Sequence, residues 1–166
     1  MITRMQRNRG FTIIEIVLVL AVAGLIFLIV FLALPSLQRE RRNTQRKSDA
    51  ARLLAQLENY QANNARPPIS SSDVNNFVNG YIKSEEYNDP KTGPYDIQGL
   101  SDDTYNGHQY YPNVGQIYFK ARHVCVDNPG GPGTDMIQHA DKTYFSVVVW
   151  TQLENGIIYC IDNGDG

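Results

Sequence analysis

The hydrophobic pattern of the chain begins with an unbroken apolar run near its N-terminus. Residues 16–34 carry no polar side chain, and in residues 11–34 only Thr12 and Glu15 are polar. About 20 apolar residues are enough for a helix to cross a bilayer. A helix exposed to water keeps one polar face, which this run lacks. The pattern therefore predicts a membrane-spanning helix over residues 11–34, surrounded by lipid or by similar helices.

Three other structures could account for the same run. A cleavable secretory signal has a shorter apolar core of about 7–15 residues followed by small residues, and the chain from Arg39 onward offers no such site. A buried core helix is disfavoured because 166 residues are too few to surround it. A plain single-pass anchor stays open, although a carboxylate such as Glu15 costs about 2.5–3.5 kcal/mol inside a membrane on insertion scales. The alternative is that Glu15 lies shallow enough to reach the membrane interface and has no function.

A second helical pattern follows the apolar run. Residues 38–48 are polar on every side and offer no apolar stripe to bury. Apolar side chains then return at the spacing of one helix face, which predicts an amphipathic helix over residues 35–64 that packs on a sheet. The side chains of this stripe are Ala50, Leu53, Leu54, Leu57 and Tyr60.

Residues 65–166 are predicted to form a globular head. Its first half, residues 65–115, is rich in Pro, Asn, Asp and Gly, which predicts loops and turns. One short helix is expected over residues 73–81, with Ser72 or Asp73 as its N-cap, because short polar side chains bind the free N–H groups at a helix start.

Strand patterns gather at the C-terminal end of the head. They cover residues 116–126, 143–152 and 156–161. Asn155-Gly156 lies between the last two runs and is a strong hairpin signal. The expected fold class is α+β, a long N-terminal helix packed on a small antiparallel β-sheet of three or four strands.

The charges are divided unevenly along the chain. The net charge of −2 disfavours a general nucleic-acid-binding domain, which is usually strongly basic. Residues 39–52 hold six cations against two carboxylates, a net charge of +4, whereas residues 53–166 hold six cations against 14 carboxylates, a net charge of −8. A basic neck and an acidic head could attract each other between subunits, or the cations could meet lipid headgroups. Both interpretations stay open.

The N-terminal residues resemble a known signature. Arg9-Gly10-Phe11-Thr12-Ile13-Ile14-Glu15 follows two further arginines, Arg4 and Arg7, and precedes the apolar run. This arrangement resembles the N-terminus of type IV pilins and pseudopilins. The resemblance implies that a prepilin peptidase cuts between Gly10 and Phe11, so that residues 1–10 are a leader peptide, and that Phe11 is then N-methylated. Glu15 becomes the fifth residue of the mature chain, where the family has a glutamate.

Two further positions are compared with the family pattern. Gly24 falls at the fourteenth mature position, where many members carry glycine. Many pilins have proline at the twenty-second mature position, whereas here Pro35 is the twenty-fifth. The place where this helix kinks or melts in a filament is therefore left open.

The resemblance implies a function and a set of partners. The chain is expected to be a structural subunit that polymerises with other copies of itself into a surface filament for adhesion, motility or DNA uptake. Prepilin peptidase, an inner-membrane assembly platform with its ATPase, and membrane lipid before assembly are the implied partners; nucleic acid is possible but not indicated. The alternatives are a pseudopilin or minor pilin of a type II secretion or competence system, and a single-pass anchored binding domain that never polymerises.

Glu15 and the new N-terminus suggest how subunits find their register. Cleavage leaves a cationic amine on Phe11, and methylation keeps its charge. A carboxylate buried without a partner is costly, and breaking a buried ion pair is expensive even where the pair adds little net stability. We therefore expect Glu15 to pair with the Phe11 amine of an adjacent subunit and to set the axial stagger.

The expected location is the cytoplasmic membrane, with the head outside, and then an extracellular pilus. Arginines at positions 4, 7 and 9 favour a cytoplasmic N-terminus, while the six cations that follow the span favour the opposite orientation by a simple count. We expect the head outside, because the resemblance to the cleavage signature and the pair of cysteines both indicate that side.

Cys125 and Cys160 are the two cysteines, and an even count outside the cytoplasm indicates one disulfide. Many pilins carry a C-terminal disulfide loop, so the resemblance implies the same. Two buried free thiols stay open, while a zinc site is disfavoured because the three histidines show no ligand spacing. No cofactor is expected. The resemblance to pseudopilins, some of which bind calcium in such loops, leaves calcium binding by the acidic loops at 127–135 and 162–166 open, but these loops lack the spacing of a calcium loop and an acidic tail is favoured. No nucleophile–base set or phosphate loop supports an enzyme.

Overall fold

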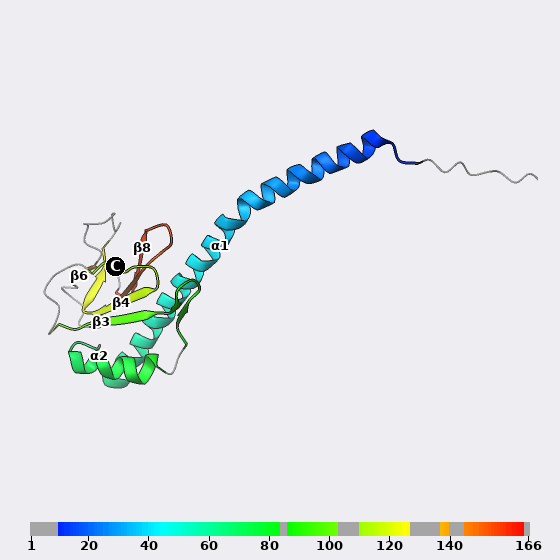
Figure 1. The fold of residues 1–166 in the computed structure, drawn as a ribbon. Coiled ribbons are helices and arrows are strands. Elements are labelled where there is room, and N and C mark those ends of the chain that lie inside the picture. Colours follow the sequence, from blue (N-terminus) through cyan, green and yellow to red (C-terminus); the bar gives the residue numbers. More distant parts are fainter. Residues whose placement is uncertain (1–9, 84–85, 103–109, 127–136, 140–144, 165–166) are drawn as a thin grey trace, which may run out of the picture. The chain divides into compact units, whose positions relative to one another are not determined.

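One long helix runs through two compact units of the chain. The computed structural model describes residues 10–83, 86–102, 110–126, 137–139 and 145–164. Helix α1 (Ile13–Asn64) is 52 residues long, and the boundary between the two units falls between Arg39 and Glu40 (Figure 1). The membrane-spanning and amphipathic patterns of the sequence therefore belong to a single helix, with Pro35 inside it.

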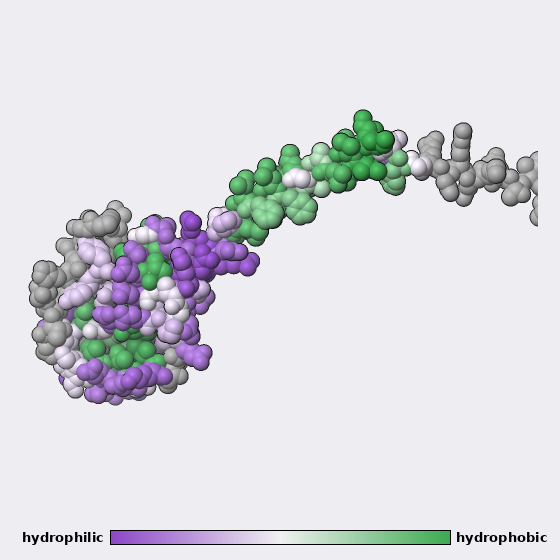
Figure 2. Space-filling model, viewed as in Figure 1, coloured by the Kyte–Doolittle hydropathy of each residue, from purple (hydrophilic) through white to green (hydrophobic). Residues whose placement is uncertain are grey.

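The first unit exposes its apolar side chains. Large apolar residues along this part of α1 are exposed by between 43% at Leu34 and 84% at Ile13. Figure 2 shows this apolar surface in green. The helix is long and apolar enough to cross a membrane by length and composition. Because the described part of the chain does not cover this surface, it needs an apolar environment.

The second unit contains a mixed four-stranded sheet. Its strand order is β3-β4-β7-β8, with the bounds β3 (Asp96–Leu100), β4 (Gln116–Ala121), β7 (Val147–Gln152) and β8 (Ile158–Asp162). The pairs β4–β7 and β7–β8 are antiparallel, as expected, whereas β3 pairs with β4 in parallel. The α+β fold class, a long helix on a small sheet, is confirmed. The parallel edge strand lies in the region for which the sequence predicted only loops and one short helix.

Two small strand pairs complete the head. The pair β1 (Asn88–Asp89) and β2 (Gly93–Pro94) is antiparallel, as is the pair β5 (His123–Cys125) and β6 (Ile137–His139). The predicted strand over residues 116–126 is divided into β4 and β5 at Arg122, whose φ of 59° lies in the left-handed region. A bulky residue adopts that conformation rarely, and it turns the chain out of the sheet.

The amphipathic stripe of α1 packs on one face of the sheet, as predicted. Ala50, Leu53 and Leu57 are fully buried, and they belong to the same core as Phe119 and Val149. The opposite face of the sheet has its own apolar cluster of Leu100, Tyr118, Val148 and Trp150. Side chains that alternate along a strand reach opposite faces, so both faces of the central strands are buried.

The short helix starts earlier than the sequence predicted. Helix α2 (Ser71–Phe77) continues into a π-helical turn, η1 (Val78–Ile82). The N-cap is Ser70, so the prediction of Ser72 or Asp73 is wrong: the Ser70 hydroxyl accepts from the Asp73 N–H at 3.2 Å. The Asp73 carboxylate accepts in return from the Ser70 N–H at 3.2 Å, which completes a capping box.

The predicted hairpin is present between β7 and β8. The connection places Gly156 at a φ of +82°, a conformation that glycine adopts without strain. The Gly156 N–H donates to the Leu153 carbonyl at 3.0 Å, and the Leu153 N–H donates to the Ile157 carbonyl at 2.9 Å. These bonds close the turn and fix the strand register.

Candidate functional site

The N-terminal site begins where α1 starts. Thr12 precedes the helix and acts as its N-cap: the Glu15 N–H donates to the Thr12 hydroxyl at 3.4 Å. The Glu15 carboxylate accepts from the Thr12 N–H at 3.5 Å. This reciprocal pair is a capping box, in which a negative side chain also faces the positive end of the helix dipole. Glu15 therefore helps to define the first helical residue, Ile13.

The cap leaves the two residues before it outside the helix. Phe11 is 81% exposed, and no described atom lies within 4 Å of a Cβ built on Gly10. The peptide bond between Gly10 and Phe11, which the resemblance implies is cut, is thus open to solvent. The leader arginines Arg4, Arg7 and Arg9 lie outside the described residues.

The second site is the neck, where α1 enters the head. Arg46 is fully buried, and its guanidinium faces Asp89, whose side chain is also fully buried. The Arg46 Nη2 atom donates to Asp89 Oδ1 at 3.1 Å, while Arg46 Nε donates to Asp89 Oδ2. Arg46 Nη1 donates to Asn43 Oδ1 at 3.2 Å and to Glu154 Oε1 at 3.3 Å. Most guanidinium donors therefore have a partner.

A second arginine joins this network from the preceding turn of α1. Arg42 Nη2 donates to Glu154 Oε2 at 2.9 Å, and Arg42 Nε donates to the other oxygen of the same carboxylate. The Glu154 N–H donates to Asn43 Oδ1 at 3.0 Å. We call these residues, Arg42, Asn43, Arg46, Asp89 and Glu154, the neck network. It ties the helix to the β1–β2 turn and to the β7–β8 hairpin.

The arginines hold both carboxylates of the neck network in their charged forms. The Arg42 hydrogen bond lowers the pKa of Glu154 from 4.5 to about 2. Burial disfavours the charged form of Asp89, but the hydrogen bonds from Arg46, Thr92 and Lys91 outweigh it and lower the pKa of that carboxyl. A buried arginine that binds a carboxylate through two hydrogen bonds forms a strong ion pair. Removing one partner of such a pair is strongly destabilising.

The neck network adds a contact that the sequence pattern did not reveal. Residues 38–48 offer no apolar stripe to bury, but the polar side chains of Asn43 and Arg46 are buried there. The sequence shows only a polar helix, because the partners lie 43 and 108 residues further along the chain. The neck network thus neutralises Arg42 and Arg46 of the basic neck within their own head.

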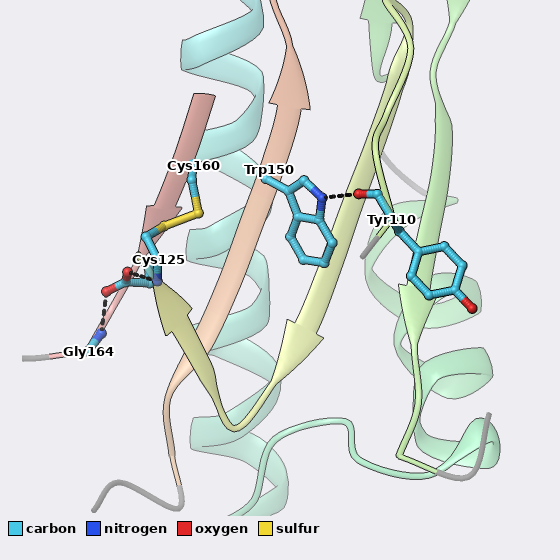
Figure 3. Close-up of a disulfide and its surroundings, with 6 residues drawn as sticks. Tyr110, Cys125, Trp150, Cys160 and Gly164 are labelled. Carbon is cyan, nitrogen blue, oxygen red and sulfur yellow. Dashed lines mark hydrogen bonds between the residues drawn. A yellow bond between two sulfur atoms is a disulfide. The ribbon is translucent and has the colours of Figure 1, made fainter. Parts of the chain in front are cut away.

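The disulfide lies on the sheet face opposite α1. Cys125 and Cys160 are joined across 35 residues, the pairing that the sequence analysis expected. The Asp162 carboxylate accepts from the Cys125 N–H at 2.7 Å and from the Gly164 N–H at 3.0 Å. Trp150 packs in the same cluster, with its indole N–H donating to the Tyr110 carbonyl at 2.9 Å (Figure 3). The C-terminal segment is therefore pinned by both a covalent bond and a carboxylate.

The remaining metal candidates give no ligand set in the described part of the chain. No group of three His, Cys, Asp or Glu side chains comes together among the described residues. His123 is buried, and its Nδ1 lies 3.0 Å from the Ala121 carbonyl. His108, the side chain of His139 and the acidic loop 127–135 lie outside the described residues.

Comparison with known families identifies the N-terminal segment. Residues 5–31 match the family model of the prokaryotic N-terminal methylation motif. The segment therefore carries the signature of type IV pilins and prepilins, and the motif is typical of structural subunits. The match covers part of the predicted leader and most of the apolar run, and it does not extend into the head. The search of curated proteins gave no match, nor did the search of solved structures.

Proposed function

We propose that the chain is the precursor of a type IV pilus structural subunit. The single observation that carries the proposal is the methylation motif at residues 5–31, which continues directly into the apolar surface of α1. A methylation signal and a helix that needs an apolar environment are both requirements of a subunit that moves from a membrane into a helix bundle. The α+β architecture with a long N-terminal helix agrees with this role.

Processing takes place at the bond between Gly10 and Phe11. Prepilin peptidase removes residues 1–10, and the new amine of Phe11 is then methylated. The exposure of Phe11 and the absence of described neighbours around Gly10 support this step, because a peptidase needs an accessible backbone. The capping box of Thr12 and Glu15 supports it further, because the helix then begins only after the scissile bond.

Assembly pairs Glu15 with the Phe11 amine of a neighbouring subunit. In the single chain the Glu15 carboxylate accepts only a long bond of 3.5 Å from the Thr12 N–H among the hydrogen bonds of the described residues. A cationic amine from an incoming subunit is a stronger partner, because hydrogen bonds between charged groups are shorter and roughly twice as strong. Breaking such a buried pair costs about 3–5 kcal/mol, which penalises any wrong axial register.

The cellular setting follows from these steps. Before assembly the subunit spans the cytoplasmic membrane once, with the head outside, where the Cys125–Cys160 disulfide persists. An inner-membrane platform and its ATPase then add the subunit to a growing homopolymer. The finished filament lies outside the cell.

Mass spectrometry of the mature N-terminus tests the proposal. In a host with prepilin peptidase, the chain should begin with methylated Phe11 and should be recovered in sheared filaments. Glu15→Leu should leave membrane insertion intact and strongly reduce filament yield, with Glu40→Gln as the matched control for loss of an exposed acid outside the apolar run. An intact Met1 would contradict the proposal and favour an anchored domain that does not polymerise.

A further inference from the structure

The head contains four Asn-Gly pairs, and three of them lie in the described part of the chain. These three are Asn79-Gly80 in η1, Asn155-Gly156 in the β7–β8 hairpin and Asn163-Gly164 after β8. The fourth, Asn106-Gly107, lies outside the described residues. An asparagine that precedes glycine is prone to lose its side-chain amide, because glycine has no Cβ to hinder attack by its own backbone nitrogen. The three described pairs share this chemistry and differ in their surroundings.

The hairpin pair lies at an exposed tip. Asn155 and Gly156 are both exposed. Two backbone hydrogen bonds close the tip, from the Gly156 N–H to the Leu153 carbonyl at 3.0 Å and from the Leu153 N–H to the Ile157 carbonyl at 2.9 Å. An exposed turn held by so few bonds opens locally at a low free energy. The Gly156 nitrogen is therefore released without unfolding of the head.

A backbone donor polarises the side-chain carbonyl of Asn155. Asn155 Oδ1 accepts from the Ile157 N–H at 3.3 Å. Attack on the Asn155 Cγ atom places negative charge on Oδ1, and an N–H that already points at this oxygen stabilises that charge, as in an oxyanion hole. Among the hydrogen bonds of the described residues, none holds the Asn155 amide nitrogen, which is the leaving group.

The pair after β8 is held through both ends of its amide. Asn163 Oδ1 accepts from the Val147 N–H at 2.8 Å, and Asn163 Nδ2 donates to Gln61 Oε1 at 3.5 Å. The Gly164 N–H donates to Asp162 Oδ1 at 3.0 Å. Attack at the Asn163 Cγ atom therefore breaks contacts that join the C-terminal segment to β7 and to α1.

The pair in η1 is fixed by its helical backbone. Asn79 and Gly80 are both exposed and lie within η1. The Gly80 nitrogen reaches the Asn79 Cγ atom only if the backbone torsion between the two residues leaves its helical value, because the ring that forms is nearly planar. That rotation disrupts the helical turn around the pair. Asn155 and Asn79 are therefore alike in exposure and differ in backbone.

We propose that Asn155 is a site of spontaneous deamidation, with water as the only other reactant. The Gly156 backbone nitrogen gives its proton to hydroxide and bonds to the Asn155 Cγ atom. The Cγ–Nδ2 bond then breaks, and the leaving nitrogen takes a proton from water and departs as ammonia. A second water opens the five-membered imide at either of its carbonyls. The products are aspartate, with the original backbone, and isoaspartate, whose backbone runs through the former side chain.

The isoaspartate product disturbs the neck network. Its backbone is one carbon longer than that of asparagine, in a turn whose hydrogen bonds fix the strand register. Glu154, the residue before it, accepts from Arg42 Nη2 at 2.9 Å and from Arg46 Nη1 at 3.3 Å. The longer turn displaces Glu154 from these arginines, whereas aspartate keeps the backbone and the contacts. All these contacts lie within the head, so the reaction does not depend on the proposed function.

Mass spectrometry of the full chain tests the site, with the other pairs as internal controls. The chain is aged in detergent micelles at mildly alkaline pH and digested in acid, and amide loss is measured at each asparagine. We expect loss at Asn155 to be about tenfold faster than at Asn79 or Asn163, which corresponds to about 1.4 kcal/mol in activation free energy. In the urea-unfolded chain the three rates should be similar. Equal rates in the folded chain, or faster loss at Asn79 or Asn163, would overturn the proposal.

Two variants test the effect on the neck network. Asn155→Gln keeps the amide but needs a larger ring, so its urea midpoint should not change with age, whereas the midpoint of the parent chain should fall. Fresh Asn155→Asp should unfold close to the fresh parent, because it has the aspartate product without the longer backbone. Isoaspartate is measured with an isoaspartyl methyltransferase as the reagent. An aged parent chain that carries isoaspartate at position 155 and keeps its midpoint would contradict the effect on Glu154.

Discussion

Replacing Asp89 by asparagine should destabilise the head more than removing an exposed ion pair. The side chains of Asp89 and Arg46 are both fully buried. In Asp89→Asn the amide oxygen can still accept from the Lys91 and Thr92 N–H groups, which Asp89 Oδ1 now binds at 2.9 Å each. The turn is therefore kept, and the main change is that Arg46 loses its buried counter-ion.

The size of the effect follows from burial. Removing one partner of a buried ion pair costs about 3–5 kcal/mol, because the remaining charge is left uncompensated. Glu154 lies 3.3 Å from Arg46 Nη1 and offers partial compensation, so we expect the lower end of that range, about 3 kcal/mol. Arg66 forms a 2.8 Å pair with Asp73 but is 55% exposed. Arg66→Ala should therefore cost less than about 1 kcal/mol.

Trp150 provides the assay. It is the single tryptophan of the chain and is 1% exposed, so urea unfolding of the full chain in detergent micelles can be followed by its fluorescence. The urea midpoint should fall far more for Asp89→Asn than for Arg66→Ala. Equal shifts would refute the reasoning. Combining Arg46→Met with Asp89→Asn should cost less than the sum of the single changes, because it removes the uncompensated charge.

Three further predictions use the same unfolding assay. Because the pKa of Glu154 is lowered from 4.5 to about 2, its stabilising charge is complete above the unfolded pKa and is lost as the pH falls toward 2. Glu154→Gln should therefore reduce the fall in the free energy of unfolding as the pH is lowered below 4.5. An unchanged fall would count against the neck network. Replacing Cys125 and Cys160 by serine opens a 35-residue loop and should cost about 3–4 kcal/mol in the chain-entropy model; an unchanged midpoint would contradict this. Gly99→Ala should cost about 1–3 kcal/mol by overpacking, since a Cβ there would lie 2.3 Å from the Phe119 ring, whereas Gly80→Ala meets nothing within 4 Å and serves as its control.

The sequence predicted those elements whose signals are local. The apolar run has the length of a membrane span, the stripe from Ala50 to Tyr60 has helical spacing, and one helix carries both. Asn155-Gly156 marked the hairpin because a turn needs a residue such as Gly156 at positive φ. Gly10, Phe11 and Glu15 were identified by a motif within seven residues, and the match at residues 5–31 covers all three.

Elements that depend on distant partners were missed. β3 contains Gly99, which lowers its strand propensity, but Gly99 is required because Phe119 and Val74 pack where its Cβ would be. β3 pairs with β4 in parallel, and the pattern of residues 96–100 alone does not reveal this partner. Arg46 was missed for the same reason: a lone arginine in a polar helix shows nothing of Asp89, 43 residues later.

The neck network also bears on the two roles considered for the basic neck. Arg42 and Arg46 are engaged within the head, so they contribute less to attraction between subunits than their number suggests. Pairs with buried partners are screened weakly by salt, whereas exposed charges are screened within about 10 Å at 0.1 M salt. Added salt should therefore leave the urea midpoint of the single subunit nearly unchanged. If a contact of the subunit in a filament or on a membrane weakens with added salt, that contact must depend on exposed charges such as Arg41 and Lys91. The ionic contacts of such an interface would then lie outside the neck network.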